Sequence, residues 1–266
     1  MLSVCPEDII NIYQKLEKLF GGVLKTYSAI LLCGGKGTRL RELTKDEILK
    51  PLLKVAGKEL INYSIELFEP NVVNKLVFAV DHKAEQIETW IKNQDLGYKF
   101  EISKQIAPGV LQALKDGSTY AENDIIFCNT DEIRKNLNLK EVIRTHEKFD
   151  ALATVVCTYT NNLFKHGVIQ LKDDFTVSGI LIKDKMYQNK PLEVGLVNSG
   201  FVVMKKEAIK YLDGRVDKDW NGITTPLISM GELKAYIDER IVFFNSNTAE
   251  QYYEAENYLK DNSGKN

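Results

Sequence analysis

A glycine-rich turn flanked by cations is the segment of this sequence best suited to chemistry. The stretch "AILLCGGKGTRLRELT", Ala29 to Thr44, begins with residues that favour a strand and continues with three glycines, Lys36 and Arg39. Glycines let the backbone approach an anion and present successive N–H groups to it, while the cations add positive charge. The spacing matches neither the G-x-x-x-x-G-K-[ST] phosphate loop nor the G-x-G-x-x-G dinucleotide turn. A phosphate-binding turn of another type is indicated, with a plain strand-to-helix turn as the alternative.

Strand and helix patterns alternate through the first half of the chain, and the second half is richer in strands. Strands are predicted at 28–33, 75–80, 98–102, 124–128, 151–158, 167–172, 176–182, 195–204, 234–238 and 241–244, and helices at 61–68, 84–93, 110–121, 139–149, 206–212, 223–230 and 248–260. Alternation of this kind indicates a mostly parallel sheet covered on both faces. Ligands of such sheets bind beyond the carboxyl ends of the strands. The glycine turn, "NTD" after 124–128 and "NSG" within 195–204 are therefore expected to form one site.

The chain is expected to form one domain, because no linker rich in proline, glycine or serine divides it. We expect an N-terminal helical extension at 1–26, a single α/β domain at 27–260 and a short tail at 261–266. A helix predicted at 6–20 has an apolar stripe that must be buried against another surface. Packing on its own domain is the simpler interpretation, and a subunit contact in a homo-oligomer is the alternative.

Composition excludes several classes of protein. The net charge of the 266 residues is -2 and the lysines are scattered, so no binding to nucleic acid is expected. No apolar run approaches the roughly 18 residues of a membrane span, and the acidic N-terminus does not resemble a signal peptide. A cytoplasmic protein without a membrane partner is predicted. The four cysteines and three histidines are dispersed, which favours buried free thiols over disulfides or zinc.

Two segments together resemble a known family. "LLCGGKGTRLRELT" followed by "LKPLLKVAGKELINYSIELF" is similar to the G-G-x-G-T-R-L and P-K-P signature of the NTP-dependent sugar 1-phosphate nucleotidyltransferases, which include mannose or heptose 1-phosphate guanylyltransferases and glucose 1-phosphate thymidylyl-, cytidylyl- and uridylyltransferases. The resemblance runs from Tyr27 to Leu259, with Leu49 in place of the first proline. It implies a single-domain, Rossmann-like α/β fold of the GT-A type, a three-layer sandwich with a mostly parallel central sheet and a strand-rich C-terminal half.

Five further segments resemble the family in the correct order. "PGVLQALKDG" is similar to the segment that reads the base, and "CNTDEI" to the strand end whose aspartate binds Mg²⁺. "KHGVIQL" resembles the sugar loop Y-G-V with His166 for tyrosine. "IKDKM" resembles E-K-P with Asp184 for glutamate, and "VNSGFVVM" resembles N-A-G-x-Y.

The resemblance implies a reaction that needs no general base. A sugar 1-phosphate oxygen attacks the α-phosphorus of a nucleoside triphosphate, which gives a nucleotide sugar and pyrophosphate. A phosphate monoester has a second pKa of about 6 and is already anionic at neutral pH. Catalysis is then positioning and charge neutralisation, which agrees with a sequence that lacks a plausible Ser-His-Asp or Cys-His arrangement.

Site residues follow from the same resemblance. Arg39 would hold the triphosphate and the leaving group, Lys50 the α-phosphate region, and Asp131 the Mg²⁺ cofactor. A solvated surface cation is the alternative for each lysine, and a helix N-cap is the alternative for Asp131. The implied nucleotide-binding residues are Leu32, Gly34, Gly35, Lys36, Gly37, Thr38, Arg39, Lys50, Gln105, Gly109 and Gln112, and the implied sugar-phosphate-binding residues are Gly167, Asp184, Lys185, Asn198 and Ser199.

The segment "FFNSNTAEQYY" departs from the family pattern. It is similar to W-x-D-x-G-T-P-E-x-Y, whose aspartate is a second Mg²⁺ ligand, but Asn245 and Asn247 occupy the two positions where that aspartate is found. An amide oxygen can coordinate Mg²⁺ without contributing charge. Either asparagine is therefore expected to be at most a weak second ligand, and Asp131 the principal one.

Three other functions stay open at this stage. The acceptor could be a non-sugar phosphomonoester such as phosphocholine, the enzyme could be a nucleotide-sugar glycosyltransferase, or the chain could be a lapsed nucleotide-binding protein. The sugar-side segments argue against a non-sugar acceptor. The Gly34–Arg39 loop with Lys50 argues against a glycosyltransferase. A lapsed protein is disfavoured by the retention of Arg39, Lys50, Asp131 and Lys185. The base and the sugar are not defined: "PGVLQAL" favours a pyrimidine, whereas "VNSGFVVM" suits GTP with a mannose- or heptose-type phosphate equally well.

Overall fold

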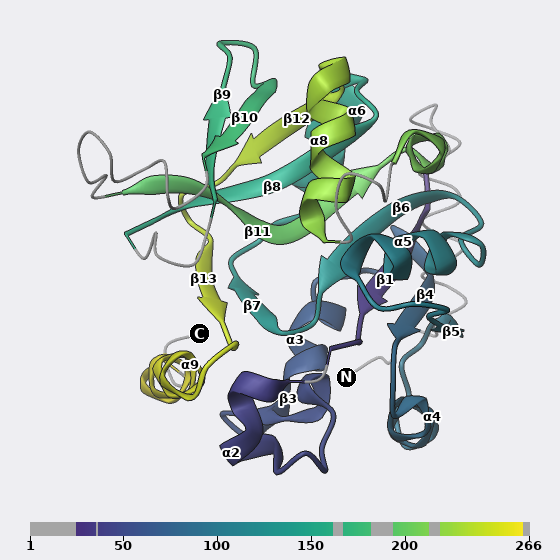
Figure 1. Ribbon diagram of the computed structural model, residues 1–266, viewed down its shortest axis with the longest axis vertical. Helices are drawn as coiled ribbons and strands as arrows, with labels where there is room; N and C mark the ends of the chain where they lie inside the picture. The colour runs from purple at the N-terminus through teal and green to yellow at the C-terminus, as the bar shows by residue number, and fades with distance from the viewer. Residues whose placement is uncertain (1–24, 36, 162–166, 182–193, 213–218, 263–266) are drawn as a thin grey trace, which may run out of the picture.

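The computed structural model describes residues 25–35, 37–161, 167–181, 194–212 and 219–262 (Figure 1). The strands are β1 (Tyr27–Leu32), β2 (Lys54–Val55), β3 (Lys58–Glu59), β4 (Val73–Val80), β5 (Lys99–Lys104), β6 (Asp124–Asn129), β7 (Glu132–Lys135), β8 (Ala153–Thr160), β9 (Val168–Leu171), β10 (Val177–Leu181), β11 (Gly195–Met204), β12 (Leu233–Ile237) and β13 (Val242–Asn245). The helices are α2 (Arg41–Thr44), α3 (Leu60–Ile65), α4 (Ala84–Lys92), α5 (Val110–Ser118), α6 (Leu139–Phe149), α8 (Trp220–Met230) and α9 (Ala249–Asp261), and Thr38–Leu40, Lys50–Leu52 and Lys206–Tyr211 form 3-10 turns.

A nine-stranded sheet runs through the molecule. Its main path is β10-β9-β11-β6-β1-β4-β5, and β8 pairs with both β11 and β12. The half formed by β6, β1, β4 and β5 is parallel throughout, and β12 joins β8 in parallel. Antiparallel pairing is concentrated around β11 and β9. The α/β fold predicted from the sequence, with a mostly parallel central sheet and a strand-rich C-terminal half, is confirmed.

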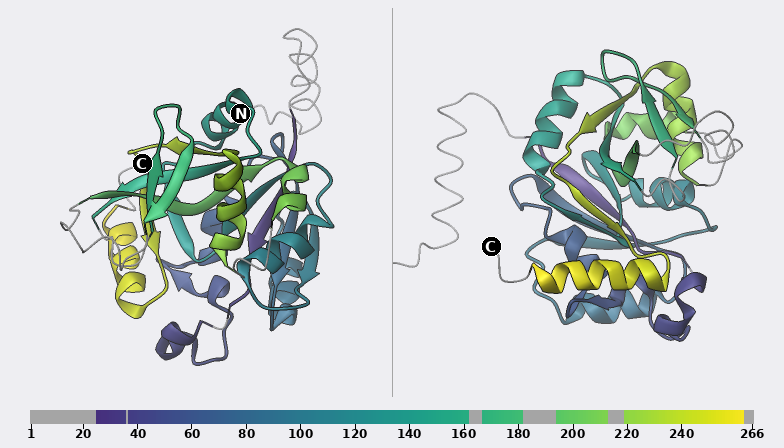
Figure 2. Two further views of the ribbon diagram at one scale, coloured as in Figure 1. Left: turned by 45° about the horizontal axis from the view of Figure 1, so that its top comes forward. Right: turned by 90° about the vertical axis from the view of Figure 1, so that its left-hand side faces the viewer.

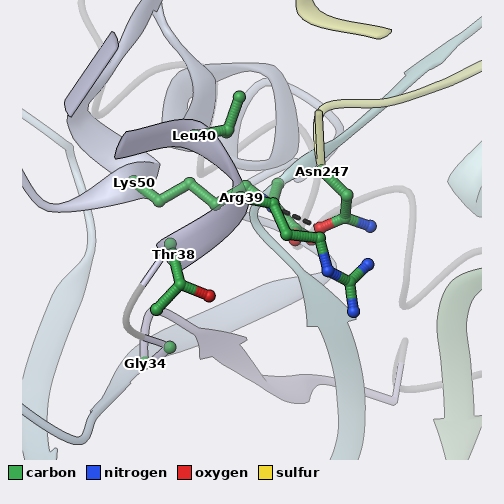
Figure 3. Close-up of a pocket in the computed structure, with 9 residues that line it drawn as sticks. Gly34, Thr38, Arg39, Leu40, Lys50 and Asn247 are labelled. Carbon is green, nitrogen blue, oxygen red and sulfur yellow. Dashed lines mark hydrogen bonds and ion pairs between the residues drawn. The ribbon is translucent and has the colours of Figure 1, made fainter. Parts of the chain in front are cut away.

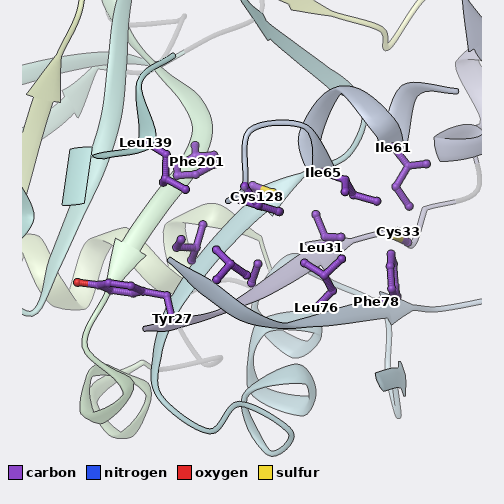
Figure 4. Close-up of a cluster of buried hydrophobic side chains, with 14 of the residues drawn as sticks. Tyr27, Leu31, Cys33, Ile61, Ile65, Leu76, Phe78, Cys128, Leu139 and Phe201 are labelled. Atoms are coloured by element: carbon purple, nitrogen blue, oxygen red, sulfur yellow. The ribbon is translucent and has the colours of Figure 1, made fainter. Parts of the chain in front are cut away.

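Successive residues of the buried strands face two separate cores. Leu31 of β1 belongs to the core that packs against α3, α4 and α6, and this cluster is drawn in Figure 4. Ile30 belongs to the core that packs against α5 and α8. Both residues are fully buried, as expected for a parallel strand covered on both faces. Figures 1 and 2 show the helices on the two sides of the sheet. The sheet is thereby held rigid beneath the loops at its edge.

A separate two-stranded sheet, formed by β7 and β13, and the last helix lie beside the large sheet (Figure 1). β13 pairs antiparallel with β7, so that Asn245 lies opposite Glu132. Ile133 of β7 and Ala255 of α9 are fully buried in a third core shared with Leu40 and Leu60. Figure 1 shows α9 below β13, near α2 and α3. The end of the described chain is therefore packed against the segment that follows the glycine turn.

Other expectations have mixed outcomes. Cys33, Cys128 and Cys157 are buried free thiols, as predicted, and burial raises the pKa of each. Within the described ranges no helix is long and apolar enough to cross a membrane. The predicted helix at 6–20 lies outside the described residues. The sequence did not predict β7, because "EIRK" is short and charged, nor α2, β2 and β3, each of which spans four residues or fewer.

A buried histidine makes stability depend on pH. His146 of α6 is 1% exposed, and its Nδ1 lies 2.9 Å from Oγ1 of Thr154. Desolvation lowers the pKa of His146 to about 4. An unfolded histidine titrates near 6.5, so this contribution to stability is complete above about pH 6.5 and is lost as the pH falls toward 4.

We expect His146→Gln to remove this acid sensitivity. Between pH 7 and pH 4.5 the wild-type protein should lose about 2–3 kcal/mol more of its unfolding free energy than the variant, measured by urea titration. His82→Gln is the matched control, because the His82 side chain is 31% exposed. An equal pH-dependent loss in His146→Gln and wild type would contradict the prediction.

Candidate active site

The site lies where four parallel strands end. β1, β4, β5 and β6 are neighbours in the sheet, and the residues that close or follow them line adjoining pockets. These residues are Gly34 and Gly35 after β1, Asp81 after β4, Gln105 after β5, and Asn129 and Asp131 at the end of β6. The carboxyl edge of a parallel sheet is the usual ligand-binding edge of this fold class.

The glycine turn forms the middle pocket, which we call the glycine-loop pocket. Its volume is about 200 Å³, and it is lined by Gly34, Gly35, Gly37, Thr38, Arg39, Leu40, Lys50, Asp131 and Asn247. Gly35 has φ 110° and Gly37 has φ 59°, which are conformations that favour glycine. Leu40 is fully buried and anchors the 3-10 turn, whereas Arg39 beside it is exposed. Figure 3 shows the guanidinium of Arg39 extending away from the loop past Asn247.

Lys50 occupies the centre of this pocket. Its side chain is 10% exposed, and its Nζ donates to Oδ2 of Asp131 and to Oδ1 of Asn247, each at 2.5 Å. The second of these bonds is drawn in Figure 3. A buried ammonium needs such partners, since an unpaired charge is costly away from water. The structure therefore brings together Arg39, Lys50, Asp131 and Asn247, three of which the sequence had singled out for catalysis.

The replacement of proline by Leu49 has a structural explanation. Leu49 has φ -65° and ψ 133°, a conformation that proline also adopts. Its backbone N–H donates to Oε1 of Gln86 at 2.8 Å, and its side chain is 1% exposed in the core beneath α4. Proline has no N–H group and could not make this hydrogen bond. In this chain the backbone before Lys50 is held by that bond and by the packing of the Leu49 side chain.

The position of Asn247 is set by the start of α9. Thr248 accepts a hydrogen bond from the backbone N–H of Gln251, and Oε1 of Gln251 accepts one from the N–H of Asn247. This arrangement differs from a capping box in one respect: the Gln251 side chain accepts from the backbone N–H of the residue before the N-cap and not from that of the N-cap Thr248. The N–H of Ser246 also donates to the carbonyl of Asp131 at 3.0 Å. Two backbone anchors thus hold the asparagine segment against the end of β6.

A second pocket, the Asn198 pocket, lies on one side of the glycine-loop pocket. Its volume is about 380 Å³, and it is lined by Asn129, Glu132, Gly167, Ile169, Ile180, Asn198, Gly200, Trp220, Asn221, Thr224, Asn245 and Asn247. Asn247 belongs to both pockets, so they adjoin. Oδ1 of Asn129 and Oδ1 of Asn245 are buried and have no hydrogen-bond partner within the described part of the chain. Buried carbonyl oxygens without protein donors need donors from water or from a ligand.

Glu132 and Arg134 form a buried ion pair below the Asn198 pocket. Nη2 of Arg134 lies 2.6 Å from Oε2 of Glu132, and the side chains are 0% and 8% exposed. Arg134 also donates to the carbonyls of Ser199, Asn129, Glu132 and Gly200. Burial raises the pKa of Glu132 to about 7, against the opposing charge of Arg134. A Cβ at Gly200 would lie 1.8 Å from Oε2 of Glu132, so glycine is required there.

A third pocket, the Gln105 pocket, lies on the other side of the glycine loop. Its volume is about 300 Å³, and its lining residues are Leu32, Gly34, Gly35, Asp81, Gln105, Pro108, Gly109, Val110 and Asp219. Gly34 and Gly35 belong to this pocket and to the glycine-loop pocket. The three pockets therefore form a row with the cations at its centre.

Two residues singled out from the sequence do not line these pockets. Gln112 lies on α5, where its Nε2 donates to Oδ1 of Asp116 at 2.7 Å. Oδ2 of Asp116 accepts from the N–H of Ile106, so this pair supports the loop before α5. Ser199 is fully buried, and its Oγ donates to the carbonyl of Val156 at 3.0 Å.

The other predicted residues fall into two groups. Leu32, Gly34, Gly35, Gly37, Thr38, Arg39, Lys50, Gln105, Gly109, Asp131, Gly167, Asn198, Asn245 and Asn247 line the row of pockets. Lys36, His166, Asp184 and Lys185 lie outside the described residues. Sequence reasoning placed Asn129 at the site only as part of "NTD", and it missed Asp81, Glu132, Trp220 and Asp219. The strand-end rule that found Asp131 could also have found Asp81, because it follows the strand predicted at 75–80.

The chain matches the family model described as "Nucleotidyl transferase" over residues 28–262. It is 26% identical over 180 residues to D-glycero-alpha-D-manno-heptose 1-phosphate guanylyltransferase of Campylobacter jejuni, a match that covers 67% of this chain and 76% of that protein. It is 25% identical over 236 residues to a probable glucose-1-phosphate cytidylyltransferase of Bacillus subtilis, which covers 78% and 87% of the two chains.

The crystal structure of HddC from Yersinia pseudotuberculosis has the same fold, with a TM-score of 0.70, 22% identity, and coverage of 88% of this chain and 100% of that chain. The family match covers residues 28–262, which include the glycine turn and the strand-end residues of the site. The chain belongs to the nucleotidyl transferase family.

Proposed function

We propose that this protein transfers a nucleoside monophosphate from a nucleoside triphosphate to a sugar 1-phosphate, which releases pyrophosphate. The row of three pockets is the observation that carries the proposal. The Gln105 pocket fits a base and ribose, the glycine-loop pocket fits phosphates, and the Asn198 pocket fits a polyhydroxyl acceptor. The relatives named above are a guanylyltransferase and a probable cytidylyltransferase of sugar 1-phosphates, which supports the same assignment.

The Asn198 pocket supports a sugar as the acceptor. Its two unpartnered amide oxygens, on Asn129 and Asn245, accept hydrogen bonds and do not donate them. Sugar hydroxyl groups can donate the hydrogen bonds that these two oxygens lack. The carboxylate of Glu132 adds a third acceptor to the same wall. Trp220 and Glu132 could instead contact a quaternary ammonium, so phosphocholine is the competing acceptor.

In this mechanism an oxygen of the sugar 1-phosphate attacks the α-phosphorus of the triphosphate. As the new P–O bond forms, the bond between the α-phosphorus and the oxygen that bridges to the β-phosphate breaks. The electron pair of that bond leaves with pyrophosphate. No proton must be removed, because the nucleophile is a phosphate with a second pKa of about 6. The protein's task is to hold two polyanions together and to offset their charge.

The cations of the glycine-loop pocket can offset that charge. Lys50 is held by Asp131 and Asn247 in the structure, and we assign its ammonium to the α-phosphate region. Arg39 is exposed at the pocket and can reach the triphosphate and the departing pyrophosphate. Backbone N–H groups of the glycine turn would contact the phosphates from below.

Mg²⁺ is part of the proposal because the oxygen ligands fit it. Asp131 supplies a carboxylate, and Asn247 and Asn245 supply amide oxygens, one of which has no partner among the described residues. Within those residues no cluster of three or more His, Cys, Asp or Glu side chains is present. Asp131 would therefore hold the ion together with substrate phosphates. The ion, when bound, supplies positive charge to the α-phosphate.

The proposal is tested by pyrophosphate release with Mg²⁺. CTP, GTP, UTP, dTTP and ATP should each be paired with hexose and heptose 1-phosphates and with phosphocholine. Turnover with at least one sugar 1-phosphate is expected. Turnover with phosphocholine alone would reassign the acceptor. Nucleotide binding by calorimetry without turnover in any pair would overturn transfer as the function.

A further inference from the structure

The Gln105 pocket presents hydrogen-bond acceptors from its polar side chains. Those side chains, among the described residues, belong to Asp81, Gln105 and Asp219. A carboxylate can only accept hydrogen bonds, whereas a glutamine amide can both donate and accept them. Nε2 of Gln105 donates to the carbonyls of Gly109 at 3.0 Å and Ala107 at 3.4 Å. These two carbonyls fix the orientation of the amide, so its Oε1 is the group left to face a ligand.

Because residue 34 is a glycine, the side chains of Gln105 and Asp81 can lie close to the backbone of the glycine turn. A Cβ at position 34 would lie 2.6 Å from Oε1 of Gln105 and 3.1 Å from Cβ of Asp81. The Asp81 side chain is 28% exposed, and His82, whose Nδ1 lies 3.9 Å from Oδ2 of Asp81, is its partner within the described residues. The carboxylate of Asp81 is therefore available to a ligand at a position beside the glycine turn.

Backbone donors also line this pocket. α5 begins at Val110, which lines the pocket, and it has no side-chain cap. The first turn of an α-helix leaves its N–H groups without partners in the helix. A base held here would meet acceptor side chains as well as backbone donors.

Guanine is the common base whose edge matches this arrangement. It carries two adjacent donors, the N1–H and the N2 amino group, next to the O6 acceptor, and two adjacent donors can bind both oxygens of one carboxylate. Cytosine and adenine place a ring-nitrogen acceptor beside their amino group, and uracil and thymine place carbonyl oxygens on both sides of N3–H. Each of these would set an acceptor against the Asp81 carboxylate.

We propose that Asp81 selects a guanine nucleotide by accepting hydrogen bonds from N1–H and the N2 amino group. This inference rests on the proposed function, because it assigns the Gln105 pocket to the base. It also replaces the pyrimidine preference that "PGVLQAL" suggested from the sequence. Asp81 is then a specificity-determining residue, and the site's substrate is GTP.

The test is nucleotide binding by calorimetry without an acceptor. ITP is the informative probe, since inosine keeps O6 and N1–H and lacks the N2 amino group. Wild-type protein should bind GTP at least about tenfold more tightly than ITP, CTP and UTP. Asp81→Asn should weaken GTP binding by about 10- to 100-fold and ITP binding much less, which would bring the two affinities within about threefold.

Asp95→Asn is the matched control, because Asp95 is an exposed aspartate outside the three pockets. It should keep the wild-type ratio of GTP to ITP affinity. Far-ultraviolet circular dichroism and thermal melting establish that each variant is folded. If Asp81→Asn fails to fold, the GTP-to-ITP ratio of the wild-type protein decides the matter alone.

Three outcomes overturn the inference: equal binding of GTP and ITP by wild-type protein, tighter binding of CTP or UTP, or an unchanged ratio in Asp81→Asn. Absence of binding by any nucleotide also overturns it. Selective GTP binding without pyrophosphate release toward any acceptor would leave the inference standing and would remove the proposed function instead. The two failures are therefore distinguishable.

Discussion

Asp131→Asn is expected to lower turnover by about 10²- to 10³-fold while the fold is retained. The substitution keeps the shape of the side chain and removes its charge. An amide is a weaker ligand for Mg²⁺, and the variant would place three neutral asparagines, at 131, 245 and 247, around the ion. Loss of one preorganised electrostatic contact at a reacting centre has an effect of this size. Turnover is measured as pyrophosphate release over a range of Mg²⁺ concentrations.

Asp46→Asn is the control for this experiment. Asp46 lies outside the three pockets, and its carboxylate pairs with Arg41 at 2.8 Å on the surface, where the two side chains are 53% and 64% exposed. Surface pairs of this kind contribute about 0–1 kcal/mol, so activity and stability should change little. Turnover of Asp131→Asn within twofold of the wild-type value would show that Asp131 has no role in catalysis and is only a partner for Lys50.

Arg134→Met is expected to lower the unfolding free energy by about 3–5 kcal/mol. The substitution leaves the Glu132 carboxylate buried without its cation, and it removes the donors to four backbone carbonyls. Buried acceptors that lose their donors cost stability because they are already shielded from water. The unfolding free energy is measured by urea titration at pH 8, where Glu132 of the wild-type protein, with a pKa of about 7, is ionised; loss of Arg134 raises this pKa further, so protonation of Glu132 is part of the expected cost.

Two further variants separate charge from packing in this pair. Glu132→Gln with Arg134→Met removes both charges, so the double variant should be less destabilised than Arg134→Met alone. Lys135→Met removes the neighbouring cation of β7 and should change stability by no more than about 0.5 kcal/mol. A loss below 1 kcal/mol in Arg134→Met would contradict the prediction and would mean that water replaces the guanidinium.

The parts of the site that the sequence predicted are those set by local patterns. The strand predicted at 28–33 and the glycines after it define the first loop without help from the rest of the chain. The strand predicted at 124–128 likewise places Asp131 at the same edge of the sheet. A parallel sheet then brings the two together, whichever residues lie between them. The order of the predicted strands and helices was correct for the same reason.

The parts that the sequence did not predict depend on contacts between distant segments. Asn198 and Ser199 are neighbours in "VNSG", yet one lines a pocket and the other donates to Val156 within the sheet. Alternation along a strand separates them, but only the pairing of β11 decides which one faces the pocket. Gln112 is a different case, because the contact that holds it is local: it donates to Asp116, one turn away on the same helix. Glu132 was missed because its strand forms only through pairing with β13.

The pairing of β13 with β7 has a consequence for the timing of protein synthesis. Every strand of the large sheet, including β12, precedes Val242 in the chain, whereas Asn247 follows Lys50 by 197 positions. Asn247 follows Ile237, the last residue of β12, by ten positions, so at about 5 to 20 residues per second it would leave the ribosome about 0.5 to 2 s after the last strand of the large sheet. Until then a nascent chain can assemble its sheet with Lys50 and Asp131 in place but without the segment that closes the site. Chains that end just before Val242 would thus contain every strand of the large sheet but would lack the segment that supplies Asn247.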